Sequence, residues 1–213
     1  TNQICAANGI VNITPSGGTP PYMFKLDDGA FQMSNSFNNL IADNYTVYIQ
    51  DANNCEISLP VTILYQPVTN TSSGMHYATI QSAINGAGSG DEIVVCAGTY
   101  NENILLNKEV TLQGQGPANT IIKAPTSCTG NGVTISASNA KLKDLKVTDF
   151  SFGVTVSGSN NEINNVELVA NCNTGLDLGN GTNNLAVLNS KLNNNTLTGF
   201  RKGTAAVVNG FTM

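Results

Sequence analysis

An internal repeat in the second half of this chain limits it to very few folds. Short segments that begin with glycine and alternate apolar with polar residues start at positions 132, 153 and 175, and a fourth starts at Gly199. These starts are 21, 22 and 24 residues apart, which is a period typical of solenoid proteins. One repeat of this length cannot bury its own apolar face, so consecutive repeats must stack on one another.

The register between neighbouring repeats predicts which side chains form the core. At a shift of 21 residues, apolar positions fall on apolar positions: Leu142 on Ile163, Leu145 on Val166, and Val147 on Leu168. The same shift places Lys141 beside Glu162 and Lys146 beside Glu167. Strands stacked about 4.8 Å apart would turn the apolar pairs into a core ladder and the charged pairs into an outer one. The pattern therefore predicts a parallel β-helix.

One short helix is expected before the repeats. Residues 78–85 place Ile80, Ala83 and Ile84 on one helical face, and Gly86, with the two glycines that follow it closely, would end the helix. A β-helix needs a cap over its first coil, because an open end exposes unpaired strand edges and core. We expect this helix to be that cap.

The segments Tyr77–Ile84, Gly90–Val95, Gly98–Asn103 and Lys108–Gly114 together resemble the N-terminal cap and first coil of the pectin-lyase-like right-handed β-helix superfamily. The resemblance implies a right-handed parallel β-helix over residues 77–213. It implies no particular chemistry, because this superfamily holds lyases, hydrolases, esterases, binding proteins and inert stalks. Residues 205–211 still have the pattern of a strand, so we expect the β-helix to be truncated at its C-terminal end and the natural protein to continue beyond Met213.

The first 66 residues predict a separate all-β module. Expected strands cover residues 10–13, 22–26, 31–37, 45–49 and 56–63, with turn-forming Gly, Pro, Asp and Asn between them. Short strands at this spacing are typical of a small immunoglobulin-like β-sandwich. Residues 67–76 would be a linker, because Thr69–Gly74 is polar and has no apolar anchor.

Within this module the segments Gly17–Tyr22, Asn44–Val47 and Asp51–Cys55 occur in the order found in a known repeat. Over residues 5–64 the chain resembles the SprB-type repeat of very large cell-surface and gliding adhesins of Bacteroidota. The resemblance implies a cell-surface location, reached by type IX secretion, and a disulfide between Cys5 and Cys55.

The remaining cysteines lie in the repeat region. Cys96 and Cys128 would lie about one coil apart at the same corner, so they could be joined by a disulfide. Cys128 and Cys172 would lie two coils apart, or about 9.6 Å at the strand spacing, which is beyond disulfide reach. We therefore expect Cys172 to be the free thiol or to pair outside this sequence.

Composition excludes several kinds of partner. Charged residues make up 11% of the chain and only nine are Lys or Arg, so no basic surface exists for nucleic acid. No apolar run is long enough for membrane insertion. Five cysteines in a weakly charged chain indicate an oxidising, extracellular compartment. A single His and the absence of a Cys-x-x-Cys motif give no metal site and no cofactor site.

Catalytic groups are also not evident in the repeats. Polysaccharide-cleaving enzymes need clustered carboxylates, with Arg or Lys nearby. The acidic residues here fall on uncharged or basic neighbours at the expected register: Asp144 on Asn165, Asp149 on Ala170, and Glu167 on Lys146. Arg201 would lie past the last complete coil. The sequence thus predicts a chain that is not an enzyme.

We expect a non-catalytic structural or adhesive segment of a large secreted bacterial cell-surface protein or extracellular fibre. Its partners would be further copies of itself, through end-to-end assembly, or an extracellular polysaccharide. The alternative is a polysaccharide-binding or polysaccharide-degrading β-helix protein whose active site lies beyond this segment. Further repeats downstream would favour the first hypothesis, and an acidic and basic cluster on later coils would favour the second.

Overall fold

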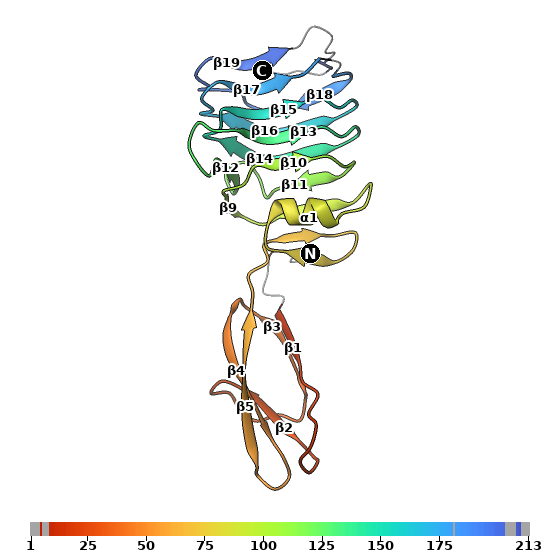
Figure 1. The fold of residues 1–213 in the computed structure, drawn as a ribbon, viewed down its shortest axis with the longest axis vertical. Coiled ribbons are helices and arrows are strands. Elements are labelled where there is room, and N and C mark those ends of the chain that lie inside the picture. The colour runs from red at the N-terminus through yellow and green to blue at the C-terminus, as the bar shows by residue number, and fades with distance from the viewer. Residues whose placement is uncertain (1–4, 6–8, 181, 203–207, 210–213) are drawn as a thin grey trace. The chain divides into compact units, whose positions relative to one another are not determined.

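The computed structural model describes residues 5, 9–180, 182–202 and 208–209, and these residues form β-strands and one short helix (Figure 1). The chain divides into two compact units, Thr1–Tyr65 and Gln66–Met213. No helix in the described part of the chain is long and apolar enough to cross a membrane.

The first unit contains two antiparallel sheets. One pairs β1 (Gly9–Asn12) with β3 (Ser36–Leu40), and the other has the order β2 (Met23–Leu26), β4 (Asp43–Gln50), β5 (Glu56–Ile63). Side chains from both sheets form one small apolar core: Val11, Ile13, Phe24, Val47 and Ile49. The sandwich confirms the all-β expectation for this unit.

Strand β3 differs from the predicted strand at residues 31–37. Gln32 makes only an isolated bridge with Phe24, and its side-chain amide donates to the carbonyl oxygens of Ser34 and Ser36. The side-chain hydrogen bonds of Gln32 thus satisfy carbonyl groups that a regular strand would pair with a neighbouring strand. The strand therefore begins later than the apolar pattern suggests.

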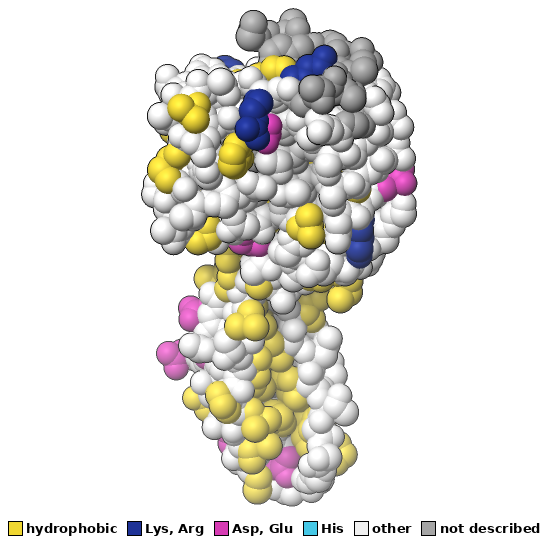
Figure 2. Space-filling model, turned by 45° about the horizontal axis from the view of Figure 1, so that its top comes forward, with side chains coloured by type: hydrophobic (Ala, Val, Ile, Leu, Met, Phe, Trp, Pro, Cys, Tyr) yellow, Lys and Arg dark blue, Asp and Glu magenta, His cyan; other side chains and the backbone are white. Residues whose placement is uncertain are grey.

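Strand β5 leaves part of the first unit's apolar face uncovered. Ile57 and Leu59 pair in register with the buried Ile49 and Val47, so they lie on the core-facing side of the sheet. They are nevertheless 60% and 51% exposed. Figure 2 shows hydrophobic side chains gathered along this unit, whereas the face of the β-helix in view is mostly polar.

The second unit is a right-handed parallel β-helix built on two main sheets (Figure 1). The five-stranded sheet has the order β10 (Ile104–Leu106), β13 (Asn131–Ile135), β15 (Phe152–Val156), β17 (Thr174–Leu178), β19 (Thr198–Lys202). The ten-stranded sheet contains β20 (Val208–Asn209), β18 (Leu185–Leu188), β16 (Glu162–Val169), β14 (Lys141–Thr148), β11 (Thr111–Gln113), β8 (Glu92–Val95), β6 (Val68–Asn70), β7 (Met75–Tyr77), β12 (Thr120–Lys123) and β9 (Gly98–Tyr100). Within both sheets the strands of successive coils pair in parallel.

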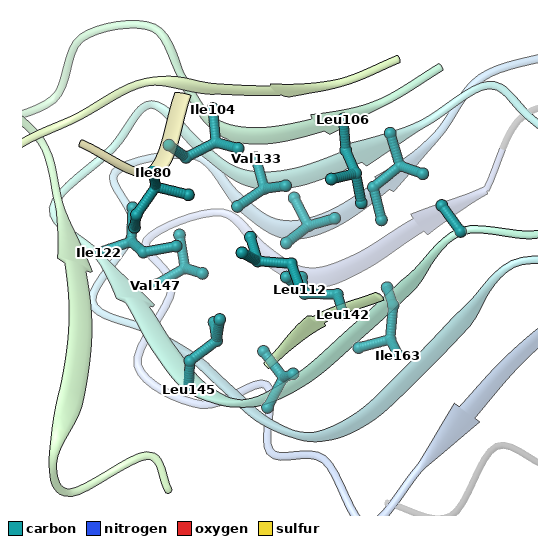
Figure 3. Close-up of a cluster of buried hydrophobic side chains, with 14 of the residues drawn as sticks. Ile80, Ile104, Leu106, Leu112, Ile122, Val133, Leu142, Leu145, Val147 and Ile163 are labelled. Carbon is teal, nitrogen blue, oxygen red and sulfur yellow. The ribbon is translucent and has the colours of Figure 1, made fainter. Parts of the chain in front are cut away.

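The core ladder has the predicted register. Strand β14 pairs with β16 so that the predicted neighbours are direct partners: Leu142 with Ile163, Leu145 with Val166, and Val147 with Leu168. All six side chains are fully buried. Figure 3 shows labelled members of the ladder converging on one interior together with Ile80 and Leu106. The 21-residue shift is therefore confirmed.

Each coil turns at residues in the left-handed backbone conformation. Three stacked sets of positive φ recur with the repeat: Asn139, Asn160 and Asn184; Asp144, Asn165 and Asn189; and Asp149, Ala170 and Asn194. Asn and Asp tolerate this conformation better than other residues that carry a Cβ atom. Many of the Asn residues in the chain therefore lie at corners that need this backbone conformation. Stacked corner residues also bond to each other, since Asn184 Nδ2 donates to Asn160 Oδ1 at 3.0 Å.

Helix α1 (Ile80–Gly86) caps the first coil with Ile80, Ala83 and Ile84 buried, as predicted. Thr79 accepts the Ser82 amide hydrogen at its N-terminus. Gln81 pairs with the outer edge of β10, because its side-chain oxygen accepts from Leu105 N at 2.7 Å and its side-chain nitrogen donates to Leu105 O at 3.3 Å. The amide of Gln81 therefore satisfies an edge that another strand would otherwise pair with.

The predicted linker at residues 67–76 is wrong. This segment forms β6 and β7, which add an antiparallel hairpin to the ten-stranded sheet. Val68 and Asn70 are fully buried, and Asn70 Nδ2 donates to Asp91 Oδ2 at 2.7 Å. Buried polar side chains that are fully hydrogen-bonded anchor this segment in place of apolar ones. The predicted strand at residues 205–211 and the expected truncation there lie outside the described residues, apart from β20.

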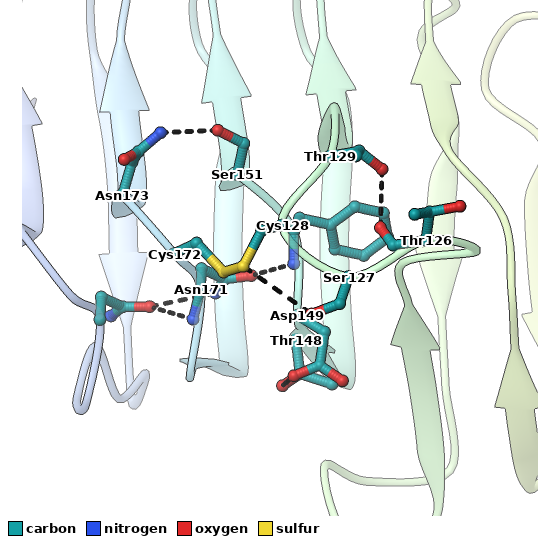
Figure 4. The surroundings of a disulfide bond; sticks show 12 residues. Thr126, Ser127, Cys128, Thr129, Thr148, Asp149, Ser151, Asn171, Cys172 and Asn173 are labelled. Atoms are coloured by element: carbon teal, nitrogen blue, oxygen red, sulfur yellow. Dashed lines mark hydrogen bonds between the residues drawn. A yellow bond between two sulfur atoms is a disulfide. The ribbon is translucent and has the colours of Figure 1, made fainter.

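The cysteine pairing also differs from the predictions. Cys128 is bonded to Cys172, with 5.3 Å between their Cα atoms (Figure 4), so Cys172 is not free and Cys128 is not joined to Cys96. Cys5 and Cys96 are both disulfide-bonded, while Cys55 is free and exposed, which excludes the Cys5–Cys55 bond.

The Cys128–Cys172 bond forms because Cys128 leaves the level of its own coil. It lies in an exposed loop, and its amide donates to Asp149 O of the next coil at 2.6 Å. The 5.3 Å between the two Cα atoms is well below the two-coil distance of about 9.6 Å, although both cysteine amides donate to the coil that holds Asp149 and Phe150. In the chain-entropy description, closing 44 residues would stabilise the fold by about 4 kcal/mol.

Candidate functional site

The outward face of the five-stranded sheet carries a row of residues at equivalent positions of successive coils. From β10 to β19 the row reads Leu105, Thr134, Thr155, Asp177 and Arg201. Thr155 donates to Thr134 Oγ1 at 3.2 Å, and Asn131 Nδ2 lies 3.3 Å and 3.4 Å from the two hydroxyl oxygens. These hydroxyl and amide groups form one polar strip along the sheet.

The row ends in a bidentate ion pair. Arg201 donates from Nε to Asp177 Oδ1 at 2.6 Å and from Nη2 to Asp177 Oδ2 at 2.5 Å. The Arg201 side chain is 59% exposed and the Asp177 side chain is 17% exposed. The hydrogen bonds and the charge of Asp177 raise the pKa of Arg201 above its already high value. The arrangement fixes a planar guanidinium group on the surface and leaves part of it open to a ligand.

An aromatic ring completes this group. Phe152 begins β15 and is half-buried, and the Arg201 guanidinium carbon lies 5.4 Å from the centre of its ring. A cation at this distance is attracted by the ring face. Phe152, Asp177 and Arg201 come from three neighbouring strands, and we call them the Phe152 cluster. The cluster combines a ring with a carboxylate and a guanidinium group beside a strip of hydroxyls.

Sequence reasoning did not find the Phe152 cluster. It placed Arg201 past the last complete coil, but Arg201 lies in β19, which pairs in full register with β17. A signal was present in the repeat, because Asp177 and Arg201 each follow a repeat glycine, Gly175 or Gly199, by two residues. The alignment of the two glycines implies this pairing, and the expectation that the complete coils end before Arg201 concealed it.

The other acidic residues of the repeats lie on the ten-stranded sheet or its corners and are paired. The ion pairs are Lys123 with Asp149, Lys143 with Glu162, and Glu167 with both Lys146 and Lys191, at 2.9–3.4 Å. Asp144 accepts a hydrogen bond from Asn165 at 2.6 Å. The hydrogen bond from Lys191, followed by the charges of Lys191 and Lys146, lowers the pKa of Glu167. In the described part of this sheet and its corners, these four acidic side chains are thus held in charge pairs or hydrogen bonds.

Metal ligands do not gather in the described ranges, where no group of three or more His, Cys, Asp or Glu side chains could hold an ion. His76, predicted in a linker, lies in β7 and its Nδ1 is 2.9 Å from the hydroxyl of Thr69. It is part of the hairpin that precedes the cap.

No protein family matches the sequence, and no curated protein matches it. Several solved structures are similar. One is pectin methylesterase PemA from Erwinia chrysanthemi, at 20% identity and a TM-score of 0.49, covering 56% of this chain and 46% of that one. Two others are pectin methylesterases in complex with hexasaccharides, at 19% and 20% identity and TM-scores of 0.47 and 0.42. The matches cover 56% and 55% of this chain, and 46% and 52% of those chains.

This chain thus spans about half the length of the structures that it matches. The parallel β-helix itself follows from the strand pairing described above. The prediction that the chain is not an enzyme is corrected by this comparison, because all three similar structures are of enzymes.

Proposed function

We propose that the β-helix belongs to an extracellular protein and binds polysaccharide along the outward face of its five-stranded sheet. The observation that carries the proposal is the Phe152 cluster beside the Thr134 and Thr155 hydroxyls. Apolar faces of sugar rings pack on aromatic rings, and sugar hydroxyls and carboxylates accept hydrogen bonds from guanidinium groups. Carboxylate and hydroxyl oxygens of the protein accept from sugar hydroxyls in return.

The shape of the face suits an extended polymer. Equivalent side chains recur at the strand spacing of about 4.8 Å, so a linear chain lying across the strands would meet similar groups at each step. The row runs over five strands without a charged residue before Asp177. The basic and acidic side chains that could hold a globular partner by charge lie mainly on the other sheet.

The disulfides support the extracellular part of the proposal. Cys128 and Cys172 form one bond, and Cys5 and Cys96 are also disulfide-bonded. Such bonds persist in oxidising compartments and are rare in the cytosol. Weak charge combined with abundant Asn, Thr and Ser is consistent with this location.

We also propose a wider context from the resemblance of residues 5–64 to the SprB-type repeat. The chain would then be part of a large adhesive cell-surface protein of Bacteroidota, exported by the type IX route and able to assemble end to end. Labelling of intact and permeabilised cells with an antibody against this chain would test the location. Light scattering of the purified chain over a range of concentrations would test assembly.

The binding proposal is tested with variants of the cluster. We expect the chain to be retained by at least one member of a panel of immobilised neutral and uronate-containing polysaccharides. Arg201→Ala should weaken retention by about tenfold or more, because a charged hydrogen bond contributes about 1.5–3 kcal/mol. Phe152→Ala should also weaken it, because it removes the ring on which a sugar would pack. Lys191→Ala is the matched control, since Lys191 is an exposed cation on the other sheet. Failure to bind any polysaccharide, or equal weakening by the control, would overturn the proposal.

A further inference from the structure

The Cys128–Cys172 disulfide lies directly beside the strand positions that hold Phe152. Phe152 has two neighbours in the five-stranded sheet, Asn131 in β13 and Thr174 in β17. Cys128 precedes Asn131 by three residues, and Cys172 precedes Thr174 by two. The disulfide therefore joins the two chain segments that lead into the strands on either side of Phe152.

The backbone between these segments is held from both sides by backbone hydrogen bonds. Cys128 N donates to Asp149 O at 2.6 Å, and Cys172 N donates to Phe150 O at 2.7 Å. Gly130 O in turn accepts from Ser151 N at 3.1 Å and from Phe152 N at 3.2 Å. The amide of Phe152 is thus bonded to a residue only two positions from a disulfide-bonded cysteine.

The loop that makes these contacts has little else to hold it. Every residue from Pro125 to Gly130 is exposed, whereas the fully buried Phe150 and Val147 pack in the core of the next coil. Exposed segments with few apolar contacts open locally at low free-energy cost. The disulfide raises the free-energy cost of opening this loop. The stability of the coil's core depends instead on its apolar packing.

We infer that the Cys128–Cys172 disulfide is a positioning element of the polysaccharide site, because it fixes the loop that sets the start of β15 and so the placement of Phe152 against Arg201. The inference rests on the function proposed above. By this inference the disulfide raises the affinity for the ligand in addition to stabilising the fold.

The first test measures placement without any ligand. Amide hydrogen exchange of the full chain should become at least tenfold faster at Ser151 and Phe152 in the Cys128→Ser/Cys172→Ser variant. Exchange at Ile163 and Val166 in β16 should be unchanged, which would show that the coils remain folded. A Cys128→Ala/Cys172→Ala variant repeats the measurement without the serine hydroxyls. Unchanged exchange at Ser151 and Phe152 would overturn the inference.

The second test uses a double-mutant cycle on polysaccharide binding. The serine variant should bind at least fivefold more weakly than the unchanged chain at a temperature where both are fully folded. Adding Phe152→Ala should cost less in the serine variant than in the unchanged chain, because both changes act through the same ring. Cys55→Ser is the control and should bind normally, since Cys55 is free.

The outcomes separate the two proposals. Normal binding by the serine variant, or strictly additive losses in the cycle, would overturn the positioning role and leave the proposed function standing. If the unchanged chain binds no polysaccharide, the proposed function fails and the claim about affinity fails with it. The exchange measurement would still decide whether the disulfide places Phe152.

Discussion

At the scale of single residues, buried amides hold the coils together where apolar side chains cannot. Asn171 is fully buried. Its Oδ1 accepts from Phe150 N at 3.2 Å, and its Nδ2 donates to Val147 O at 3.2 Å and to Asn195 Oδ1 at 3.1 Å. In the part of the structure that is described, no buried side-chain polar atom lacks a partner. The amide thus closes the corner between two sheets.

Replacing this amide should be costly. Asn171→Ala leaves the buried amide hydrogen of Phe150 without the partner it has here and removes a hydrogen bond to Val147 O, so we expect the unfolding free energy to fall by about 2–4 kcal/mol. Asn183→Ala, at an exposed position between β17 and β18, should change it by less than about 0.5 kcal/mol. Equilibrium unfolding in denaturant measures both. Similar small effects from the two variants would contradict the role of the buried amide.

Glu167 makes the fold sensitive to acid. Its contact with Lys191, then the charges of Lys191 and Lys146, hold the pKa of Glu167 below its usual value near 4.5. A carboxylate whose pKa is lower in the folded state contributes stability above its unfolded pKa and loses it as pH falls through the folded value. We expect Glu167→Gln to lose less stability than the unchanged chain between about pH 5 and pH 3. Unfolding curves at both pH values test this, with the exposed Asp28→Asn as control, and identical pH dependence would contradict it.

At the scale of elements, the cap helix depends on side chains from the first coil. Glu102 accepts from Ile80 N at 3.0 Å and from Gln81 N at 3.1 Å, so it satisfies two amide hydrogens at the helix N-terminus that have no partner within the helix. Lys108 donates to Asn85 O and Ala87 O, both at 2.7 Å, near the other end. The helix is thus bonded at both ends to the coil that it covers.

Removing the first of these contacts should loosen the cap. Glu102→Ala should lower the unfolding free energy by about 1–2 kcal/mol, and Glu102→Gln should cost less because its amide oxygen can still accept. Amide exchange at Ile80 and Gln81 should accelerate in the alanine variant. Unchanged exchange at these two amides would show that Thr79 alone caps the helix.

The elements that could be predicted from the sequence are those with a regular apolar repeat. The shift that places Leu142 on Ile163 is visible in the sequence, because a ladder demands an apolar residue at every step. The hairpin of β6 and β7 was missed, because Asn70 is buried through hydrogen bonds rather than through apolar contact. The Cys128–Cys172 bond was missed because an exposed loop moves Cys128 off its coil, and the repeat does not describe loops.

At the scale of the whole molecule, the two units differ in how completely they bury apolar surface. The β-helix encloses one continuous core from Val68 to Val187. Among its described residues, the first unit has a core of five buried side chains and leaves Ile57 and Leu59 exposed. The function proposed here therefore depends on the β-helix, whose sheet face presents the Phe152 cluster on a rigid support.

The candidate site could be predicted only in part at this scale. Four members of the outward row each follow a repeat glycine by two residues, so the repeat implies that they are neighbours, and the strand pairing shows it: Thr134, Thr155, Asp177 and Arg201. Contact with Phe152 depends on a long side chain that reaches over an intervening strand. Residue spacing in the sequence does not predict this contact between Arg201 and Phe152.

The most direct test is a nuclear magnetic resonance titration of the chain with a soluble oligomer of whichever polysaccharide it retains. The largest shift changes should fall on the outward side chains of β13, β15, β17 and β19, with Phe152 and Arg201 foremost, and the signals of β14 and β16 should stay in place. Changes confined to β14 and β16, or to residues 9–63 of the first unit, would contradict a polysaccharide site on the five-stranded sheet.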